Sequence, residues 1–131
     1  MNDAIFIIAN SAPRPFAPFS HAVEAGGFLF VTGQMPIDPK NPDAPLPDGI
    51  AEQTRMVLAN LSAVVTHAGY SFGDAVAVRA FLRDFNRDYK EFNAVYETHF
   101  EHGRLPARTT VGVTGLARDA LVEIDMICRK T

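Results

Sequence analysis

The chain has 131 residues, of which 47% are hydrophobic and 21% are charged, so we expect a single domain over residues 1–131 with a core of its own. The formal net charge of −3 and the lack of a long basic run argue against a protein that binds nucleic acid by neutralising phosphates. The single cysteine, Cys128, excludes an intrachain disulfide and favours a reducing compartment.

The N-terminal segment is predicted to begin with a short strand. Residues 5–9 are rich in β-branched and aromatic side chains, which is typical of a strand. The apolar run over residues 4–9 is too short to span a bilayer, and it lacks the basic flank and longer apolar stretch of a secretory signal. We therefore expect a cytoplasmic protein without membrane association.

A hairpin and a long loop are predicted next. Residues 19–23 and 28–32 read as strands on either side of the turn at Gly26-Gly27. Residues 33–49 contain five prolines, and this density excludes a regular element. Long loops of this kind are often functional.

Two helices are expected. Residues 50–68 carry apolar side chains at steps of three and four, which lays one apolar stripe along a helix. Gly69 follows where a C-terminal cap is expected. Residues 89–102 carry a second stripe that is largely aromatic, with Asn93 as its polar member.

Three further strands are predicted at residues 75–84, 108–113 and 120–128. The first is apolar on both faces, which indicates a sheet covered on both sides. One of its faces is expected to carry Val76, Val78, Ala80 and Leu82.

The order of elements predicts an α+β domain with two helices on one face of a mixed sheet. The opposite face is expected to include Phe81 and Ile127. Because this face also needs cover, oligomerisation is the expected way to bury it.

Charged side chains inside two predicted strands are the main candidates for chemistry. Arg108 presents a planar fork of donors that suits a carboxylate, and Glu123 offers an oxygen that can hold or activate a water. Strand alternation places Glu123 and Asp125 on the face opposite the helices. Ion pairing is the structural alternative. Either acid could form an ion pair at the subunit interface with Arg79 or Arg83, and Arg108 could pair with one of the same acids.

Some other residues are candidate walls of a pocket, whereas several familiar kinds of site are absent from the sequence. Hydroxyls follow Arg108 at Thr109 and Thr110, and residues 19–20 and 32–34 lie at predicted strand ends. The chain has no glycine-rich phosphate loop and no nucleophile elbow. We expect no metal, because the histidines lack a ligand spacing with Cys128 or paired acids: His21, His67, His99 and His102.

Several segments together resemble the RidA/YjgF family of enamine/imine deaminases, also called the endoribonuclease L-PSP family. The resemblance runs over nearly the whole chain, and each motif alone would be weak. The motifs are residues 17–23 (APFSHAV), 30–39 (FVTGQMPIDP), 52–55 (EQTR), 58–61 (LANL), 92–96 (FNAVY), 106–111 (PARTTV) and 120–124 (ALVEI).

The resemblance implies a chorismate-mutase-like fold, assembled as a homotrimer with clefts between adjacent subunits. It implies hydrolysis of reactive imino or enamine acids, released by pyridoxal-phosphate enzymes, to 2-oxo acids and ammonia without a cofactor. Arg108 would hold the substrate carboxylate and Glu123 would position the water. The substrate pocket would be lined by Phe19, Thr32, Gly33, Asn93 and Thr110.

One departure from the family pattern leaves alternatives open. Active relatives usually carry tyrosine where this chain has Phe19, so one hydrogen-bonding hydroxyl is missing. The alternatives are a small-molecule-binding or regulatory trimer without catalysis, a deaminase of a ring-opened aromatic catabolite, and a ribonuclease. The negative net charge and the lack of a basic stripe disfavour the ribonuclease.

Overall fold

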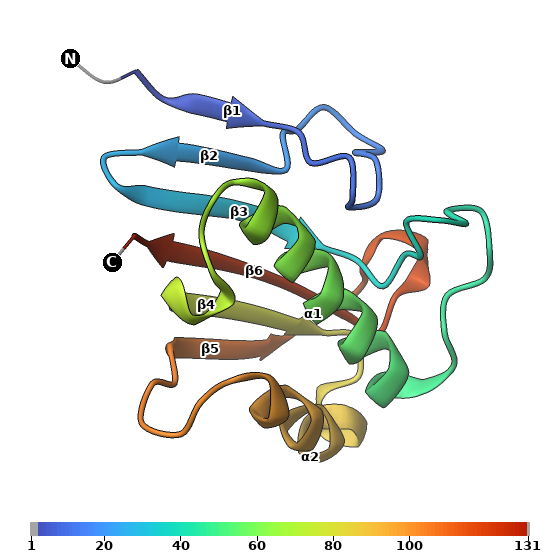
Figure 1. Ribbon diagram of the computed structural model, residues 1–131. Coiled ribbons are helices and arrows are strands. Elements are labelled where there is room, and N and C mark those ends of the chain that lie inside the picture. The colour runs from blue at the N-terminus through green and yellow to red at the C-terminus, as the bar shows by residue number, and fades with distance from the viewer. Residues whose placement is uncertain (1–2, 131) are drawn as a thin grey trace.

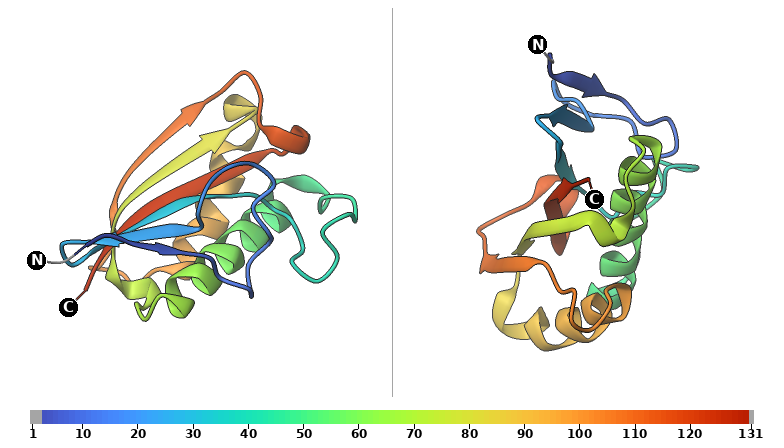
Figure 2. Two further views of the ribbon diagram at one scale, coloured as in Figure 1. Left: turned by 90° about the horizontal axis from the view of Figure 1, so that it is seen from above. Right: turned by 60° about the vertical axis from the view of Figure 1, so that its left-hand side comes forward.

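In the computed structural model, which describes residues 3–130, six strands form one mixed sheet and two α-helices lie along one of its faces (Figure 1, Figure 2). The strands are β1 (Ile5–Ile7), β2 (Ala22–Ala25), β3 (Phe28–Gln34), β4 (Ala75–Leu82), β5 (Ala107–Gly112) and β6 (Val122–Arg129). The helices are α1 (Gly49–His67) and α2 (Phe85–Tyr96). The predicted α+β class is confirmed. No helix within residues 3–130 combines the length and the apolar character that crossing a membrane requires.

The strand order across the sheet is β1-β2-β3-β6-β4-β5. β4 and β5 are parallel, and the other neighbours are antiparallel. α2 connects β4 to β5 in the chain and makes the crossover that a parallel pair requires. The last strand, β6, lies in the middle of the sheet, whereas β5 forms an edge (Figure 1). Glu123 therefore belongs to a central strand and Arg108 to an edge strand.

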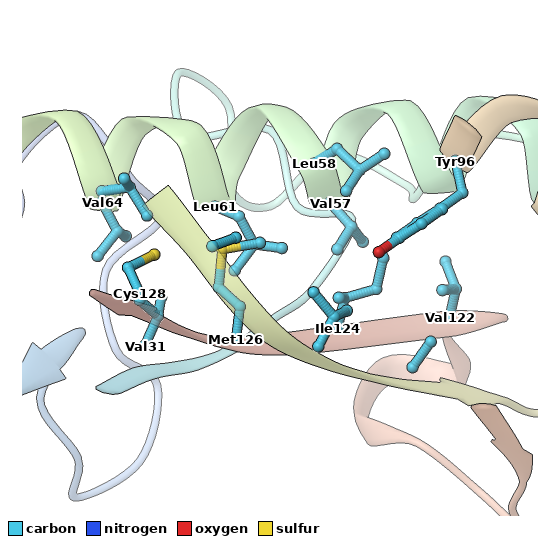
Figure 3. Packing of buried hydrophobic residues seen from close by; sticks show 14 of the residues in the cluster. Val31, Val57, Leu58, Leu61, Val64, Tyr96, Val122, Ile124, Met126 and Cys128 are labelled. Atoms are coloured by element: carbon cyan, nitrogen blue, oxygen red, sulfur yellow. The ribbon is translucent and has the colours of Figure 1, made fainter. Parts of the chain in front are cut away.

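The main core fills the space between α1 and the central strands. Val57, Leu61 and Val64 lie at helical spacing along α1 and are fully buried. They face Ile124 and Met126 of β6 (Figure 3). Each such side chain contributes roughly 1.5–3 kcal/mol when it is removed from water. The apolar stripe predicted over residues 50–68 is thus the buried face of α1.

Cys128 lies in the same core and is fully buried. Burial, and to a lesser extent the negative charge of Asp74, raises the pKa of its thiol to about 12. The thiol therefore stays protonated at neutral pH and packs as a small hydrophobic side chain.

The second helix begins earlier than the sequence predicts. α2 starts at Phe85, where residues 89–102 were expected, because the carboxylate of Asp84 accepts a hydrogen bond at 3.3 Å from the backbone N–H of Arg87 and caps the first turn. At its other end the helix tightens into a 3-10 turn at Glu97–His99. The aromatic stripe correctly placed Phe92 and Tyr96 on the buried face, whereas its first member, Tyr89, is 36% exposed. The capping residue, not the stripe, set the start of the helix.

The prediction for Val76 was wrong. The pairing of β4 with β6 shifts between Ala75 and Ala77, and such an irregularity changes the face to which a side chain points. As a result Ala75 is buried, whereas Val76 is 43% exposed. Val78, Ala80 and Leu82 lie in the core as predicted.

Among the described residues, no helix covers the face of the sheet opposite α1 and α2 (Figure 2), and exposed apolar side chains lie on it. Phe6, Val23, Phe30 and Ile127 are aligned by pairing across β1, β2, β3 and β6. Phe6 is 71% exposed and Phe30 is 45% exposed. We call this surface the open face; such an apolar surface is typical of a contact between subunits.

Candidate active site

Arg108 lies near the start of β5, on the face that the helices cover. Its register partner on β4 is Val78, which is buried in the main core. The guanidinium lies beside α2, where Nη2 donates a hydrogen bond to Oδ1 of Asn93 at 2.8 Å. The same nitrogen is 3.5 Å from the hydroxyl of Tyr89. The structure therefore brings two of the predicted site residues, Arg108 and Asn93, into contact.

These neighbours orient the charge of Arg108 without neutralising it. Its guanidinium carbon lies 4.7 Å from the ring centroid of Tyr96 and 5.4 Å from that of Phe92, and both ring faces attract a cation. Asn93 is neutral, and none of the ion pairs described within residues 3–130 includes Arg108. The alternative pairing of Arg108 with a strand acid is thus not made in the single chain, which leaves the arginine suited to bind an anion.

Two hydroxyls next to this arginine are buried without a hydrogen-bond partner. Thr110 follows Arg108 by two residues, so both side chains point to the same face of β5, and its hydroxyl has no partner. The hydroxyl of Tyr96 is in the same condition. Burial raises the pKa of Tyr96 to about 12, against the opposing effect of the Arg108 charge. Tyr96 therefore stays neutral beside the guanidinium.

Glu123 lies on the open face, next to a β-bulge in β3. Its register partner on β4 is Phe81. Between Val31 and Gln34 the register of β3 on β6 shifts, and the bulge places Gly33 directly beside Glu123. A Cβ atom on Gly33 would overlap with Oε2 of Glu123 and would lie 3.0 Å from its Cδ. The predicted site residue Gly33 thus provides the space that the glutamate occupies.

The environment of Glu123 favours its neutral form. Burial, followed by the negative charge of Asp125, raises the pKa of Glu123 above its ordinary value. No hydrogen bond or ion pair described for residues 3–130 holds this carboxylate. A carboxylate with a raised pKa is a stronger base than a solvated one, which suits a group that accepts a proton from water.

The other strand acid has a structural partner. Arg79 donates to both carboxylate oxygens of Asp125, at distances of 2.7 and 3.1 Å, as the ion-pair alternative for Asp125 anticipated. Arg83 pairs instead with Asp119 and donates to its backbone carbonyl at 2.9 Å. The two arginines proposed as partners are thus engaged elsewhere, and Glu123 is left unpaired among the described residues.

The N-terminal loop brings Phe19 to the end of β3 that carries Thr32 and Gly33. Phe19 and Gly33 both line a small hollow. The hydroxyl of Thr32 donates to the backbone carbonyl of Ser20 at 2.6 Å, which ties the bulge to the loop. Gly33 thus adjoins Glu123 and shares this hollow with Phe19. We call Phe19, Thr32, Gly33 and Glu123 the glutamate half-site.

His21 anchors this loop, a role that its sequence context did not reveal. The backbone N–H of Ala9 donates to Nδ1 of His21 at 2.8 Å, so Nε2 carries the proton and donates to the carbonyl of Pro13 at 2.7 Å. The usable signal was its place between a proline-rich segment and a strand, where backbone groups need other partners.

The remaining predicted residues form a second group. Arg108, Asn93 and Thr110 lie between β5 and α2 on the helix-covered face, and we call them the arginine half-site. Glu123 points to the opposite face of the same sheet. Within one chain, the guanidinium of Arg108 and the carboxylate of Glu123 therefore cannot hold one small ligand between them.

The hollows of the single chain agree with this division. Four hollows are described on the surface of residues 3–130, and neither Arg108 nor Glu123 lines any of these four. The largest, of about 410 Å³, lies on the open face and is lined in part by Phe30, Arg79 and Ile127. Within the same residues, no group of three His, Cys, Asp or Glu side chains is arranged to hold a metal ion.

Comparison with known proteins adds the evolutionary context. Residues 9–130 match the family model described as Endoribonuclease L-PSP. The chain is 43% identical to a RutC family protein of Pyrococcus horikoshii, over 99% of each chain. It is 37% identical to the 2-iminobutanoate/2-iminopropanoate deaminase of Escherichia coli K12, over 92% of this chain and 94% of that protein. The crystal structure of E. coli TdcF with bound serine superposes with a TM-score of 0.89 and 31% identity, over 97% and 99% of the two chains.

Proposed function

Because the chain belongs to the RidA/YjgF family, whose model is described as Endoribonuclease L-PSP, we propose that it hydrolyses reactive 2-imino acids and their enamine forms to 2-oxo acids and ammonia. The observation that carries the proposal is the oriented but unneutralised guanidinium of Arg108. It suits the carboxylate that every such substrate carries. The 37% identical deaminase of E. coli and the serine held by TdcF, itself a carboxylate, support the same substrate class.

We infer that the working site is formed by two subunits. Arg108 and Glu123 lie on opposite faces of one sheet, so a second copy must bring its glutamate half-site to the arginine half-site of the first. Two different surfaces then meet, and a contact of this type closes into a ring when the rotation permits. The open face supplies an apolar surface for it. A ring of three copies, as the family resemblance implies, would contain three equivalent sites.

The proposed chemistry needs positioning and one proton-transfer group. Arg108 binds the substrate carboxylate, and this fixes the adjacent imine carbon in the joint site. The carboxylate of Glu123 from the neighbouring copy holds a water and takes its proton as the oxygen attacks that carbon. The nitrogen receives this proton, which gives the neutral carbinolamine. The carboxylate then transfers the hydroxyl proton to the same nitrogen, the C–N bond breaks, and ammonia leaves as the carbonyl forms. The atoms of one imine and one water thus give one 2-oxo acid and one ammonia.

Mixed oligomers provide the test of both the activity and the shared site. Arg108→Ala and Glu123→Gln should each abolish hydrolysis of the imine when measured alone. When the two variants are coexpressed and form mixed rings, a site regains activity if its arginine comes from the Glu123→Gln chain and its glutamate from the Arg108→Ala chain. For random mixing of equal amounts this is about a quarter of all sites, since each half-site has an even chance of being intact.

The activity is measured as the loss of imine available to a trapping amine, with the imine supplied by an amino-acid oxidase acting on L-alanine. Arg104→Ala is the matched control, because Arg104 is an exposed arginine outside both half-sites. Mixing that restores no activity would exclude a site between two subunits. Full activity of either single variant would exclude the role assigned to that residue.

A trimer that binds small carboxylates without turnover is the second candidate. It is favoured by Phe19, whose ring supplies no hydroxyl to the glutamate half-site. Binding of pyruvate that depends on Arg108, together with no imine hydrolysis by the wild-type chain, would support this function instead.

A further inference from the structure

We propose that the site selects 2-imino acids with a flat, aromatic side chain, and that Tyr89 is a residue that determines this specificity. The inference rests on the proposed function, because it concerns the substrate that Arg108 holds. It is carried by two pairs of aromatic rings, one in each half-site, whose outer surfaces the core does not use.

The first pair adjoins the arginine. The rings of Phe85 and Tyr89 on α2 are stacked, with centroids 4.5 Å apart and an interplanar angle of 21°. Their position depends on Gly112, since a Cβ atom there would lie 3.0 Å from Cβ of Phe85. The hydroxyl of Tyr89 is 3.5 Å from Nη2 of Arg108. The stacked pair therefore stands beside the anchor for the substrate carboxylate.

Tyr89 differs from the other rings near Arg108 in its exposure. Phe92 is fully buried and Tyr96 is 5% exposed, whereas Tyr89 is 36% exposed. The first two rings form part of the core and support the guanidinium from beneath. Tyr89 instead presents a free ring surface, and its long contact with Arg108 leaves its hydroxyl able to bind another group. A bound molecule can therefore pack on the ring and form a hydrogen bond with the hydroxyl.

The second pair belongs to the glutamate half-site. Phe16 and Phe19 meet edge to face, with ring centroids 5.6 Å apart and an interplanar angle of 87°. Both line the hollow beside Gly33, and Phe16 is 57% exposed. When two copies join their half-sites, the ligand between Arg108 and Glu123 has an aromatic pair on each subunit beside it.

This surrounding favours a flat unsaturated side chain over a small aliphatic one. Aromatic rings attract one another when their centroids are about 4.5–7 Å apart, beyond the effect of buried area. A methyl group would leave most of the two exposed ring surfaces uncovered. The chemical class that fits the site is the imine of a 2-oxo acid with an aromatic ring, and the imine derived from phenylalanine is its simplest member.

The test compares two imines on the assembled wild-type protein. An L-amino-acid oxidase produces the imine from L-phenylalanine or from L-alanine, and semicarbazide traps whatever imine survives. We expect kcat/KM to be about tenfold higher for the phenylalanine-derived imine, as one additional aromatic contact on each subunit predicts. Equal or better hydrolysis of the alanine-derived imine would overturn the proposal.

Variants of Tyr89 distinguish a contact of its ring with the substrate from a role of the residue in folding. Tyr89→Ala should raise KM for the aromatic imine about three- to tenfold and leave the alanine-derived imine within about twofold. Tyr89→Phe should keep the aromatic preference, because it keeps the ring. Lys90→Ala, at the neighbouring exposed position of α2, is the control and should match the wild type on both substrates. A uniform loss with both imines in Tyr89→Ala would show a structural role and contradict the proposal.

Binding distinguishes failure of this inference from failure of the hydrolase. Calorimetric titration with phenylpyruvate and pyruvate measures recognition without turnover. If neither imine is hydrolysed but phenylpyruvate binds more tightly than pyruvate in a Tyr89-dependent way, the aromatic preference stands and the hydrolase fails. If alanine-derived imine is hydrolysed and the two oxo acids bind equally well, the aromatic preference fails and the hydrolase stands. The same titrations with Phe16→Ala test the aromatic pair of the glutamate half-site, and this variant should also bind phenylpyruvate less tightly.

Discussion

Gly33 and Glu123 show how one missing side chain can place a functional group. The carboxylate of Glu123 occupies the space where a Cβ atom of residue 33 would stand. Gly33 has a φ angle outside the left-handed region, so close approach, and not backbone freedom, requires glycine at this position. The β-bulge in β3 brings the two residues together.

Gly33→Ala should therefore displace Glu123 and lower kcat for imine hydrolysis at least about tenfold, since an error near 1 Å in a reacting group can cost more than that. Gly115→Ala is the matched control, because a Cβ atom at Gly115 meets nothing within 4 Å. Steady-state kinetics and circular dichroism measure turnover and folding. Wild-type kcat in a folded Gly33→Ala protein would contradict this placement of Glu123.

Burial and the charge on Asp125 are expected to set the acid limb of the pH profile through the pKa of Glu123. Burial and Asp125 raise the pKa of Glu123, and the water-holding role requires the deprotonated carboxylate. Activity should therefore fall as the pH drops through this raised pKa. Asp125→Asn removes the like charge, lowers the pKa of Glu123 and should move the acid limb of kcat/KM to lower pH.

Replacing Arg79, the ion-pair partner of Asp125, should shift the acid limb in the opposite direction. Arg79→Gln removes the cation that offsets the Asp125 charge, so the pKa of Glu123 should rise and the acid limb should move to higher pH. Profiles of kcat/KM against pH for both variants check the sign. Shifts in the same direction would show that Asp125 does not act on Glu123 through its charge.

At the scale of elements, the loop before β2 depends on a single ring. His21 is 1% exposed and accepts from Ala9 while it donates to Pro13. Since this loop carries Phe16 and Phe19, the anchor sets the wall of the glutamate half-site. A ring with one acceptor and one donor is what two buried backbone groups of opposite kind require.

His21→Leu should lower the free energy of unfolding by about 1–3 kcal/mol for each backbone group left unpaired. His21→Gln is the matched variant, because an amide also has one acceptor and a donor, and it should recover much of the loss. Urea denaturation measures both. Equal stability of the leucine and glutamine variants would mean that the hydrogen bonds of His21 do not hold the loop.

At the scale of the whole molecule, the open face is expected to hold the subunits together. Phe30 lies in the middle of its aligned apolar row and is 45% exposed. Phe30→Asp should place a charge in the contact, at a cost that the apolar area cannot offset, and convert the proposed trimer to monomers.

Ile5→Asp is the control for this change. Ile5 is 54% exposed, but its register with Glu24 and Leu29 places it on the face opposite to that of Phe30. Analytical ultracentrifugation should find an oligomer for the wild type and for Ile5→Asp, and a monomer for Phe30→Asp. Persistence of the oligomer in Phe30→Asp would move the subunit contact away from the open face.

Local patterns in the sequence determined the elements and the kinds of residue available for chemistry. Helical spacing over residues 50–68 correctly gave α1 and its buried face, because a 3.6-residue period is a property of neighbouring residues alone. Strand alternation correctly separated Glu123 from the core-facing residues of β6. The start of α2 was less accurate, since a cap at Asp84 outweighed the aromatic pattern.

Contacts between segments that are distant in the chain decided on which face of the sheet each half-site lies. Alternation along β5 cannot say which face Arg108 occupies; its pairing beside Val78 does. The bulge at Gly33 and the shift at Val76 arise from partner strands far away in the chain, and each changes the face of a side chain. Pairing across the sheet is a long-range property, which is why the separation of Arg108 from Glu123 emerged only with the tertiary structure.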